Sequence, residues 1–175
     1  LSFVKFLLIV FIFLNSCSKD EKKISIIEEK EINLQMIDAY KEGVKALETG
    51  DAIFAAKKFN EAEILFPQSE WAPRAVLMAA YSYYSQNYYG DAIFELERFI
   101  KTYPKDDRLN YAHYLLAMCH YESIVDEKKD LKPLLNAKKS FNLVIEKFPL
   151  TDFAIDAKYK LGLINDLLAA KEMYI

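Results

Sequence analysis

Two histidines and a cysteine in one short segment, His113, Cys119 and His120, are residue types that could hold a metal ion. Imidazole nitrogen and thiolate sulfur are common ligands of Zn²⁺. On a helix, the interval between the two histidines would place them on the same face. A third convergent ligand is not evident, so we expect no metal site. Cys119 fits better as a small apolar side chain in the core.

The sequence patterns of the common enzyme classes are missing. We find no serine–histidine–aspartate set, no glycine-rich phosphate loop and no nucleotide-binding fingerprint. We therefore expect no catalytic residues and no cofactor, and a binding protein rather than an enzyme.

Cys17 follows a segment with the features of an export signal. Lys5 supplies a positive charge, and residues 6–14 form an unbroken apolar run. At 1.5 Å per residue this run reaches about 14 Å, roughly half the hydrocarbon core of a bilayer. It therefore fits a signal peptide better than a membrane-spanning helix, and we predict a signal peptide over residues 1–16.

The end of this segment predicts a lipid modification. Leu14-Asn15-Ser16-Cys17 is similar to a bacterial lipobox, whose cysteine is acylated and becomes the N-terminus after cleavage. Ser18 stands where similarity to Gram-negative lipoproteins would require aspartate for retention in the inner membrane, which implies an outer-membrane location. Residues 17–35 would be the lipidated cysteine and a tether. The alternative is an ordinary signal peptide followed by an incidental cysteine.

Composition places the rest of the chain in the all-α class. Only four glycines and five prolines occur in 175 residues, and β-branched runs are scarce beyond the signal segment. The 53% hydrophobic content is enough for a buried core. The net charge of −3 comes from 23 basic and 26 acidic residues interspersed along the sequence, so no basic stripe is available for nucleic acid.

An internal repeat emerges when the sequence is aligned on Pro67, Pro104 and Pro149. Alanine stands twelve residues before and eight residues after each proline, and apolar residues stand eight and five residues before it. A small residue stands thirteen residues after each proline. The aligned sets are Ala55, Ala92 and Ala137; Phe59, Leu96 and Phe141; Ala62, Phe99 and Val144; Ala75, Ala112 and Ala157; and Ala80, Ala117 and Gly162.

These sets resemble the tetratricopeptide repeat, in which small residues let two helices cross closely and a proline follows the second helix. Residues 36–175 are therefore expected to form a tetratricopeptide-repeat superhelix, an α-solenoid of about three and a half helical hairpins with an incomplete last repeat. A heptad coiled coil is the structural alternative, but prolines at these intervals argue against it. The expected helices are 36–48 with 52–65, 69–85 with 89–102, 107–125 with 134–147, and one from about 151 onward.

Local signals set the ends of these helices. Ser69, Asp106 and Thr151 each stand two residues past a proline and are suitable N-caps for the following helix. The third unit is longer than the others, and its extra residues, Asp126 to Pro133, are charged and close with a proline. We expect these residues to form a surface loop between two helices.

Two segments extend the resemblance from a repeat to a family. Residues 98–121 read RFIKTYPKDDRLNYAHYLLAMCHY, and residues 166–173 read DLLAAKEM. Together with the lipobox, they resemble the BamD family, lipoproteins of the outer-membrane β-barrel assembly machinery. The resemblance implies a periplasmic scaffold, lipid-anchored to the outer membrane, that binds BamA, other assembly-machinery subunits and unfolded outer-membrane protein segments. Family members carry further repeats beyond this point, and those repeats are associated with the BamA contact.

The same repeat geometry implies which side chains line the concave surface of the solenoid. These come from the first helix of each pair, at fixed offsets from the small crossing residue, and they include seven of the twelve tyrosines. Tyrosine offers a large contact area and a polar tip, and arginine can pair with a carboxylate in a forked geometry. The predicted peptide-binding residues are Tyr40, Arg74, Tyr81, Tyr84, Tyr111, Tyr114 and Tyr121.

Two alternatives remain at this point. The tyrosines could pack against neighbouring helices and expose only their hydroxyl groups. The chain could also be another periplasmic tetratricopeptide adaptor, in envelope constriction or peptidoglycan synthesis, although such proteins tend to lack a lipobox.

Overall fold

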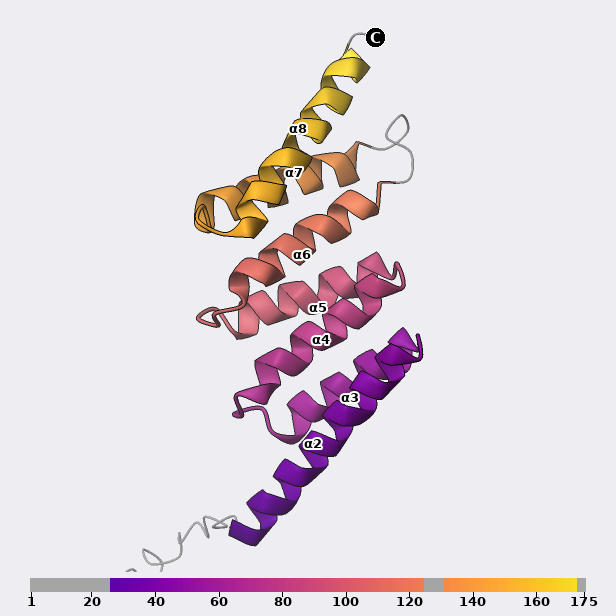
Figure 1. Ribbon diagram of the computed structural model, residues 1–175, viewed down its shortest axis with the longest axis vertical. Coiled ribbons are helices and arrows are strands. Elements are labelled where there is room, and N and C mark those ends of the chain that lie inside the picture. The colour runs from indigo at the N-terminus through magenta and orange to yellow at the C-terminus, as the bar shows by residue number, and fades with distance from the viewer. Residues whose placement is uncertain (1–25, 125–130, 173–175) are drawn as a thin grey trace, which may run out of the picture. The chain divides into compact units, whose positions relative to one another are not determined.

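A computed structural model describes residues 26–124 and 131–172 of the chain (Figure 1). Contacts divide the chain into residues 1–31 and residues 32–175, and packing is described below for the second unit. The predicted signal peptide, Cys17 and the start of the predicted tether lie outside the described residues. The described helices are α2 (Ile26–Glu48), α3 (Ala52–Leu65), α4 (Trp71–Ser85), α5 (Tyr89–Thr102), α6 (Leu109–Glu122), α7 (Lys132–Lys147) and α8 (Asp152–Glu172).

The described residues contain no β-strand, which confirms the all-α prediction. The bounds of α3 and α5 are those expected from the repeat. The helix α2 begins at Ile26 rather than near residue 36, inside the segment predicted to be a tether. Residues 26–36 contain neither glycine nor proline, so no residue there interrupts the helix. Among the described residues, no helix is both long enough and apolar enough to cross a bilayer.

Consecutive helices pack against each other from α3 to α8, as Figure 1 shows. The first helices of successive hairpins also meet, because α4 contacts α6 and α6 contacts α8. Each hairpin therefore covers the apolar side of the next one, which is how a solenoid buries a continuous core.

The aligned positions of the repeat form this core. Ala55, Ala92 and Ala137 are fully buried, as are the bulky residues Phe59 and Phe141 of the second helices. Apolar groups at these positions leave water, and each fully buried bulky side chain contributes about 1.5–3 kcal/mol. The predicted repeat therefore describes the packing of the hairpins as well as the spacing of the sequence.

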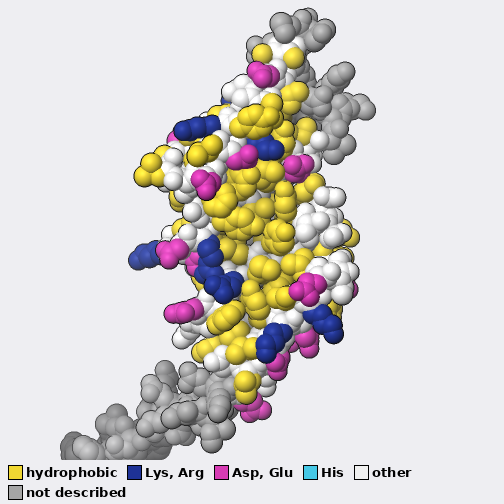
Figure 2. Space-filling view, viewed as in Figure 1, with side chains coloured by type: hydrophobic (Ala, Val, Ile, Leu, Met, Phe, Trp, Pro, Cys, Tyr) yellow, Lys and Arg dark blue, Asp and Glu magenta, His cyan; other side chains and the backbone are white. Residues whose placement is uncertain are grey.

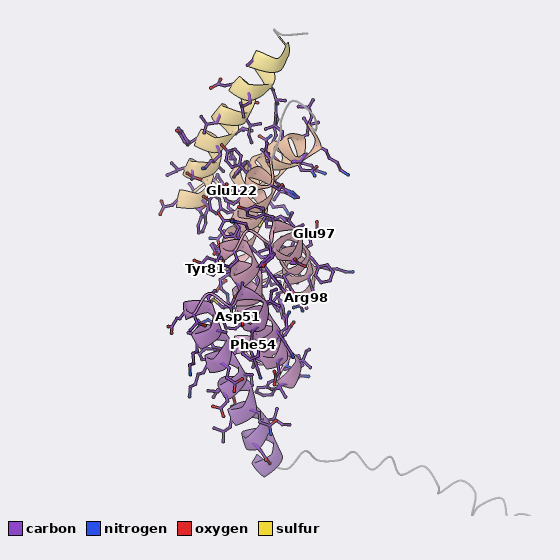
Figure 3. All side chains as sticks on the ribbon, turned by 90° about the vertical axis from the view of Figure 1, so that its right-hand side faces the viewer. Asp51, Phe54, Tyr81, Glu97, Arg98 and Glu122 are labelled. Carbon is purple, nitrogen blue, oxygen red and sulfur yellow. The ribbon has the colours of Figure 1, made fainter. Side chains whose placement is uncertain are left out.

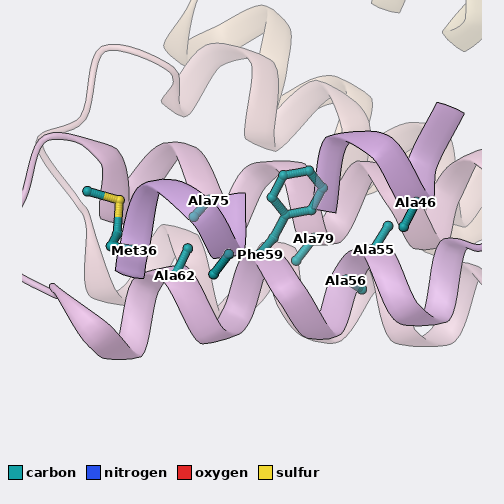
Figure 4. Packing of buried hydrophobic residues seen from close by; sticks show 9 residues of the cluster. Met36, Ala46, Ala55, Ala56, Phe59, Ala62, Ala75 and Ala79 are labelled. Atoms are coloured by element: carbon teal, nitrogen blue, oxygen red, sulfur yellow. The ribbon is translucent and has the colours of Figure 1, made fainter. Parts of the chain in front are cut away.

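The first hairpin shows why a small residue is required at the crossing. Gly43 of α2 lies directly over the Phe59 ring, and a Cβ atom on this glycine would lie 2.9 Å from two ring carbons. Phe59 is fully buried among Met36 and several alanines, including Ala55 (Figure 4). By contrast, nothing lies within 4 Å of a Cβ added at Gly162 in α8. The described residues include no second helix packed over Gly162.

Of the three predicted N-caps, Thr151 directly precedes its helix, whereas Glu70 separates Ser69 from α4. The Ser69 and Thr151 hydroxyl oxygens accept hydrogen bonds from the backbone N–H of Ala72 (3.2 Å) and Ala154 (3.3 Å). Asp106 differs, because its carboxylate accepts the Arg108 backbone N–H at 2.9 Å, just before α6 begins. It therefore orders the turn that leads into α6.

The predicted loop Asp126 to Pro133 is shorter than expected. The helix α7 begins at Lys132, and Pro133 lies in its first turn. Proline suits this position because its missing N–H would have no partner in the first turn and its φ is already helical. Proline thus starts a helix here instead of closing a loop. Residues 125–130 lie outside the described residues.

Candidate functional site

A pocket of about 260 Å³ opens between the first helices of two adjacent hairpins. Most of its wall is apolar, and it contains two guanidinium groups, one on α4 and one in the turn before α6. Figure 2 shows hydrophobic side chains gathered in a band over α4, α6 and α8 on this face. The pocket residues are Arg74, Leu77, Met78 and Tyr81 from α4, Arg108 from the turn before α6, and Tyr111 from α6.

Aromatic rings stand beside the pocket on the α2 side. The Arg74 guanidinium lies over the Trp71 ring, 5.0 Å from its centroid, a cation–π geometry. Tyr40 meets the Trp71 ring edge-on at 5.3 Å and the buried Phe59 ring at 5.1 Å. Burial raises the pKa of Tyr40, although Arg74 and Arg108 nearby act to lower it. Tyr40 is therefore held by its neighbours at the margin of the pocket.

The two arginines differ in how far their charge is already paired. Arg108 donates two hydrogen bonds of 2.7 Å to the Asp106 carboxylate, and these bonds lower the pKa of Asp106. Arg74 makes no ion pair with any described residue and rests only on Trp71. A guanidinium that is held in place but unpaired is suited to a carboxylate on a ligand.

Two tyrosines complete the pocket wall. Tyr81 is 38% exposed, the most exposed of the predicted tyrosines. Tyr111 is half-buried, and its pKa is raised to about 12 by burial and then by Tyr81 and Tyr84 nearby. Its hydroxyl therefore stays protonated at neutral pH and is available as a hydrogen-bond donor.

The other predicted tyrosines are already engaged within the protein. Tyr84 packs at 6.0 Å against Tyr89 of α5, and Tyr121 packs edge-on at 6.1 Å against the buried Phe141. The Lys160 ammonium lies 5.0 Å from the Tyr121 ring centroid. These contacts agree with the alternative in which tyrosines pack against neighbouring helices.

Tyr114 is the most firmly held of them. Its hydroxyl donates a 2.7 Å hydrogen bond to Asp156 of α8, and its ring stacks on Phe153 at 5.0 Å. The structure thus brings Tyr40, Arg74, Tyr81 and Tyr111 together around one pocket. Tyr84, Tyr114 and Tyr121 lie elsewhere on the same helices, with partners of their own.

Arg108 and Trp71 belong to the pocket region, although the repeat offsets do not select them. Arg108 stands three residues before Tyr111, a spacing that places two residues on one helix face and could have identified it. Trp71 is 42% exposed and supports Arg74. No spacing in the sequence signals that role, because it depends on the rotamer of Arg74.

His113 and Cys119 are buried in α6, and His120 is half-buried there. Cys119 is fully buried, as predicted, and burial raises its pKa to about 12. Burial also lowers the pKa of His113 and of His120. Among the described residues, no group of three histidine, cysteine, aspartate or glutamate side chains could hold a metal ion.

Residues 33–175 match the model of the YfiO family, described as an outer membrane lipoprotein. Similar proteins include the outer membrane protein assembly factor BamD of Caulobacter vibrioides, 37% identical over 160 residues that cover 91% of this chain and 51% of the relative. BamD of Rickettsia prowazekii is 36% identical over 169 residues, covering 97% of this chain and 65% of the relative. The chain thus spans between about half and two thirds of the length of these relatives.

Solved structures support the fold. The first tetratricopeptide domain of Spaghetti (RPAP3) bound to the HSP90 peptide SRMEEVD superposes with a TM-score of 0.57 at 17% identity, covering 78% of this chain and 95% of that domain. The first such domain of human RPAP3 gives a TM-score of 0.58 at 17% identity, covering 82% and 99%. The predicted tetratricopeptide architecture is confirmed.

Proposed function

Since this chain belongs to the YfiO family of outer membrane lipoproteins, we propose that it acts in the assembly of β-barrel outer-membrane proteins, as a binding scaffold and not as an enzyme. Its relatives over most of its length are named outer membrane protein assembly factors. The described helices offer an apolar pocket for contact with a ligand.

The observation that carries this proposal is the pocket between α4 and α6. Arg74 stands unpaired at the rim of an apolar depression, with Tyr81 and Tyr111 forming part of the wall. An unfolded outer-membrane protein segment presents apolar side chains and, at its C-terminus, a carboxylate. The apolar wall would take the side chain, and the guanidinium would pair with the carboxylate.

The proposed location depends on the predicted lipid anchor. A lipid on Cys17, after removal of residues 1–16, would hold the domain at the periplasmic face of the outer membrane, where unfolded barrel proteins arrive. Cys17 lies outside the described residues, so the family and the sequence pattern support this part of the proposal. The anchor is tested by radiolabelled palmitate, which we expect in the wild-type chain and not in Cys17→Ala.

BamA and other subunits of the assembly machinery are the proposed partners. A pull-down from detergent-solubilised outer membrane, with the lipidated protein as bait, tests this directly. Recovery of BamA supports the proposal. Recovery of cell-wall synthases without BamA would instead support an adaptor in peptidoglycan synthesis.

Binding at the pocket is tested with a fluorescein-labelled C-terminal peptide of an outer-membrane protein, read by fluorescence anisotropy. We expect Tyr81→Ala and Arg74→Ala each to weaken binding by about tenfold, the loss of one good contact. Phe94→Ala is the control, because Phe94 is a 65% exposed aromatic residue on α5, outside the pocket.

The role of Arg74 has a sharper test in the same assay. If Arg74 pairs with the peptide carboxylate, amidation of the peptide should weaken binding to the wild type and leave Arg74→Ala unaffected. Equal affinity of both peptides for the wild type would contradict the carboxylate contact. Unchanged affinity in Tyr81→Ala as well would contradict the pocket.

A further inference from the structure

The helix α7 differs from the other described helices in charge. It contains four lysines and one glutamate, whereas the whole chain carries a net charge of −3. Lys138, Lys139 and Lys147 make no ion pair with any described residue, since the ion pairs found there involve Lys58, Arg98 and Arg108. The outer side of α7 is therefore a local basic surface on an acidic protein.

A shallow depression of about 510 Å³ runs along this surface. Leu135, which is 51% exposed, lies among its lining residues. Apolar and basic side chains therefore both line the depression. Glu146 is its only acidic lining residue. The lining residues are Leu135, Lys138, Lys139, Asn142, Leu143, Glu146 and Lys147.

A second, narrower pocket of about 240 Å³ adjoins the depression, and Leu143 lines both. Its floor comes from His113 and Leu116 of α6, and α5 and α7 form its sides. An apolar cavity of about 150 Å³ can hold a benzene molecule. The pocket is therefore large enough for one leucine or phenylalanine side chain. Its remaining lining residues are Glu97, Ile100, Lys101 and Ser140.

This surface is separate from the pocket between α4 and α6. Figure 3 shows Glu97, which lines the α5–α7 pocket, and Tyr81, which lines the α4–α6 pocket, on opposite sides of the helices. The two pockets share no lining residue. One ligand segment therefore cannot fill both by extending across a single face.

We propose that α7 and the α5–α7 pocket form an interaction surface for an acidic segment of a partner protein. The partner inserts one bulky apolar side chain beside Leu143, and its carboxylates pair with Lys139 and Lys147. These two lysines are eight residues apart, about 12 Å along a helix. Acidic residues two helical turns apart, or about four residues apart in an extended strand, would match that distance.

The shape of the site favours a protein segment over a lipid surface. Anionic lipid headgroups would pair with the lysines but would present no single side chain to a concave pocket floored by His113 and Leu116. Glu97 and Glu146 among the lining residues also disfavour a uniformly anionic surface and favour a partner whose carboxylates are spaced to avoid them. This inference does not depend on the function proposed for the other pocket.

The test is selection of binders from a displayed library of random twelve-residue peptides, with Lys139→Glu/Lys147→Glu as the counter-selection target. We expect the enriched peptides to carry acidic residues on both sides of a leucine or aromatic residue. Their affinity should fall by about tenfold in the double variant and should weaken with added salt. Enrichment without acidic residues, or no enrichment, would overturn the proposal.

Two further variants separate charge from shape. Ser140→Trp would fill the α5–α7 pocket without altering charge. It should lower the affinity of the selected peptides about as much as the double lysine variant does. Lys57→Glu/Lys105→Glu changes the net charge by the same amount at exposed positions on α3 and in the loop after α5, and should leave affinity within about twofold. Circular dichroism confirms that each variant is folded.

A vesicle assay distinguishes the other anionic occupant. If the chain co-sediments with phosphatidylglycerol vesicles, loses this binding in Lys139→Glu/Lys147→Glu and binds no selected peptide, the surface is a membrane contact and the proposal is wrong. Peptides that bind equally well to Arg74→Ala and to the wild type show that the α7 surface is independent of the α4–α6 pocket.

Discussion

The Tyr114 hydroxyl donates a 2.7 Å hydrogen bond to the Asp156 carboxylate, joining the first helix of the third hairpin to α8. The Tyr114 ring also stacks on Phe153, one turn earlier in α8. Burial and the bond to Asp156 together raise the pKa of Tyr114, so the hydroxyl remains a donor at neutral pH. This pair ties α8, which the described residues cover on one side only, to the rest of the unit.

Removing this hydroxyl should loosen α8. We expect Tyr114→Phe to lower the free energy of unfolding by about 1–2 kcal/mol, because the stacked ring remains while a half-buried carboxylate loses its donor. Urea denaturation measures the change. Asp156→Asn is the matched control, since its amide oxygen can still accept the bond. An equal loss in both variants would show that the carboxylate charge, and not the hydrogen bond, is what matters.

Replacing either of two glycines with alanine should change the stability of the protein in opposite directions. Gly43→Ala places a Cβ against the Phe59 ring and should destabilise the protein by about 1–3 kcal/mol through overpacking. Gly162→Ala adds a methyl group in open space on a helix and should stabilise it by about 0.5–1 kcal/mol. Thermal denaturation of the two variants side by side tests both. A stabilising Gly43→Ala would contradict the close crossing of α2 and α3.

A buried polar cluster joins the second helices of the first two hairpins. Arg98 of α5 donates hydrogen bonds to Glu95 at 2.8 Å and to Glu63 of α3 at 2.6 Å. Tyr103 donates to the second oxygen of Glu63, and Asn60 bonds to both Arg98 and Glu95. No buried side-chain nitrogen or oxygen among the described residues lacks a partner. The cluster is therefore fully satisfied.

Removing the Arg98 guanidinium should lower the free energy of unfolding, because buried carboxylates lose the charge that they pair with. Arg98→Met leaves two carboxylates, 10% and 7% exposed, without their partner and should destabilise the protein by about 3 kcal/mol. Chemical denaturation gives the value. Lys58→Met, which removes ion pairs to the exposed carboxylates of Glu42 and Glu61, is the control and should change stability only slightly. A similar loss in both variants would contradict a special role for the cluster.

Stability should fall as the pH is lowered below the ordinary range of histidine. Burial lowers the pKa of both His113 and His120 from 6.5 in the folded state. The unfolded chain therefore binds more protons below pH 6.5, so the stability present above that pH is lost as the pH falls. Urea midpoints at about pH 7.5 and about pH 5.5 should show this decrease. His113→Gln should make the difference between the two urea midpoints smaller. An unchanged difference would contradict the assignment to His113.

The helices and their core could be predicted from the sequence because they depend on local spacing. The positions of Ala55, Phe59 and Ala62 recur at fixed distances from a proline in each repeat, with an alanine at the first and apolar residues at the other two, and the structure buries them all. The start of α2 was missed because no residue before position 36 breaks a helix, so the sequence holds no stop signal to read. Pro133 does not by itself distinguish a loop from the start of a helix, because proline occurs both in turns and in the first turn of a helix.

The candidate site could be predicted only in part. The repeat assigns Tyr81 and Tyr114 alike to the concave side of first helices. Yet Tyr81 lies open beside a pocket, whereas Tyr114 is bonded to Asp156, 42 residues away. Which tyrosine is free depends on what the next hairpin brings opposite it, and that is set by the stacking of whole helices.

The sequence alone therefore determined the helical pairs, the buried columns and the side of each helix that faces the core, since periodicity and small residues act over one or two turns. The tertiary structure decided which charges remain unpaired. Arg74 rests on Trp71, while Arg98 is enclosed by Glu63 and Glu95. Pairing of charges depends on distances of a few ångströms between separate helices, and no spacing along the chain fixes those distances.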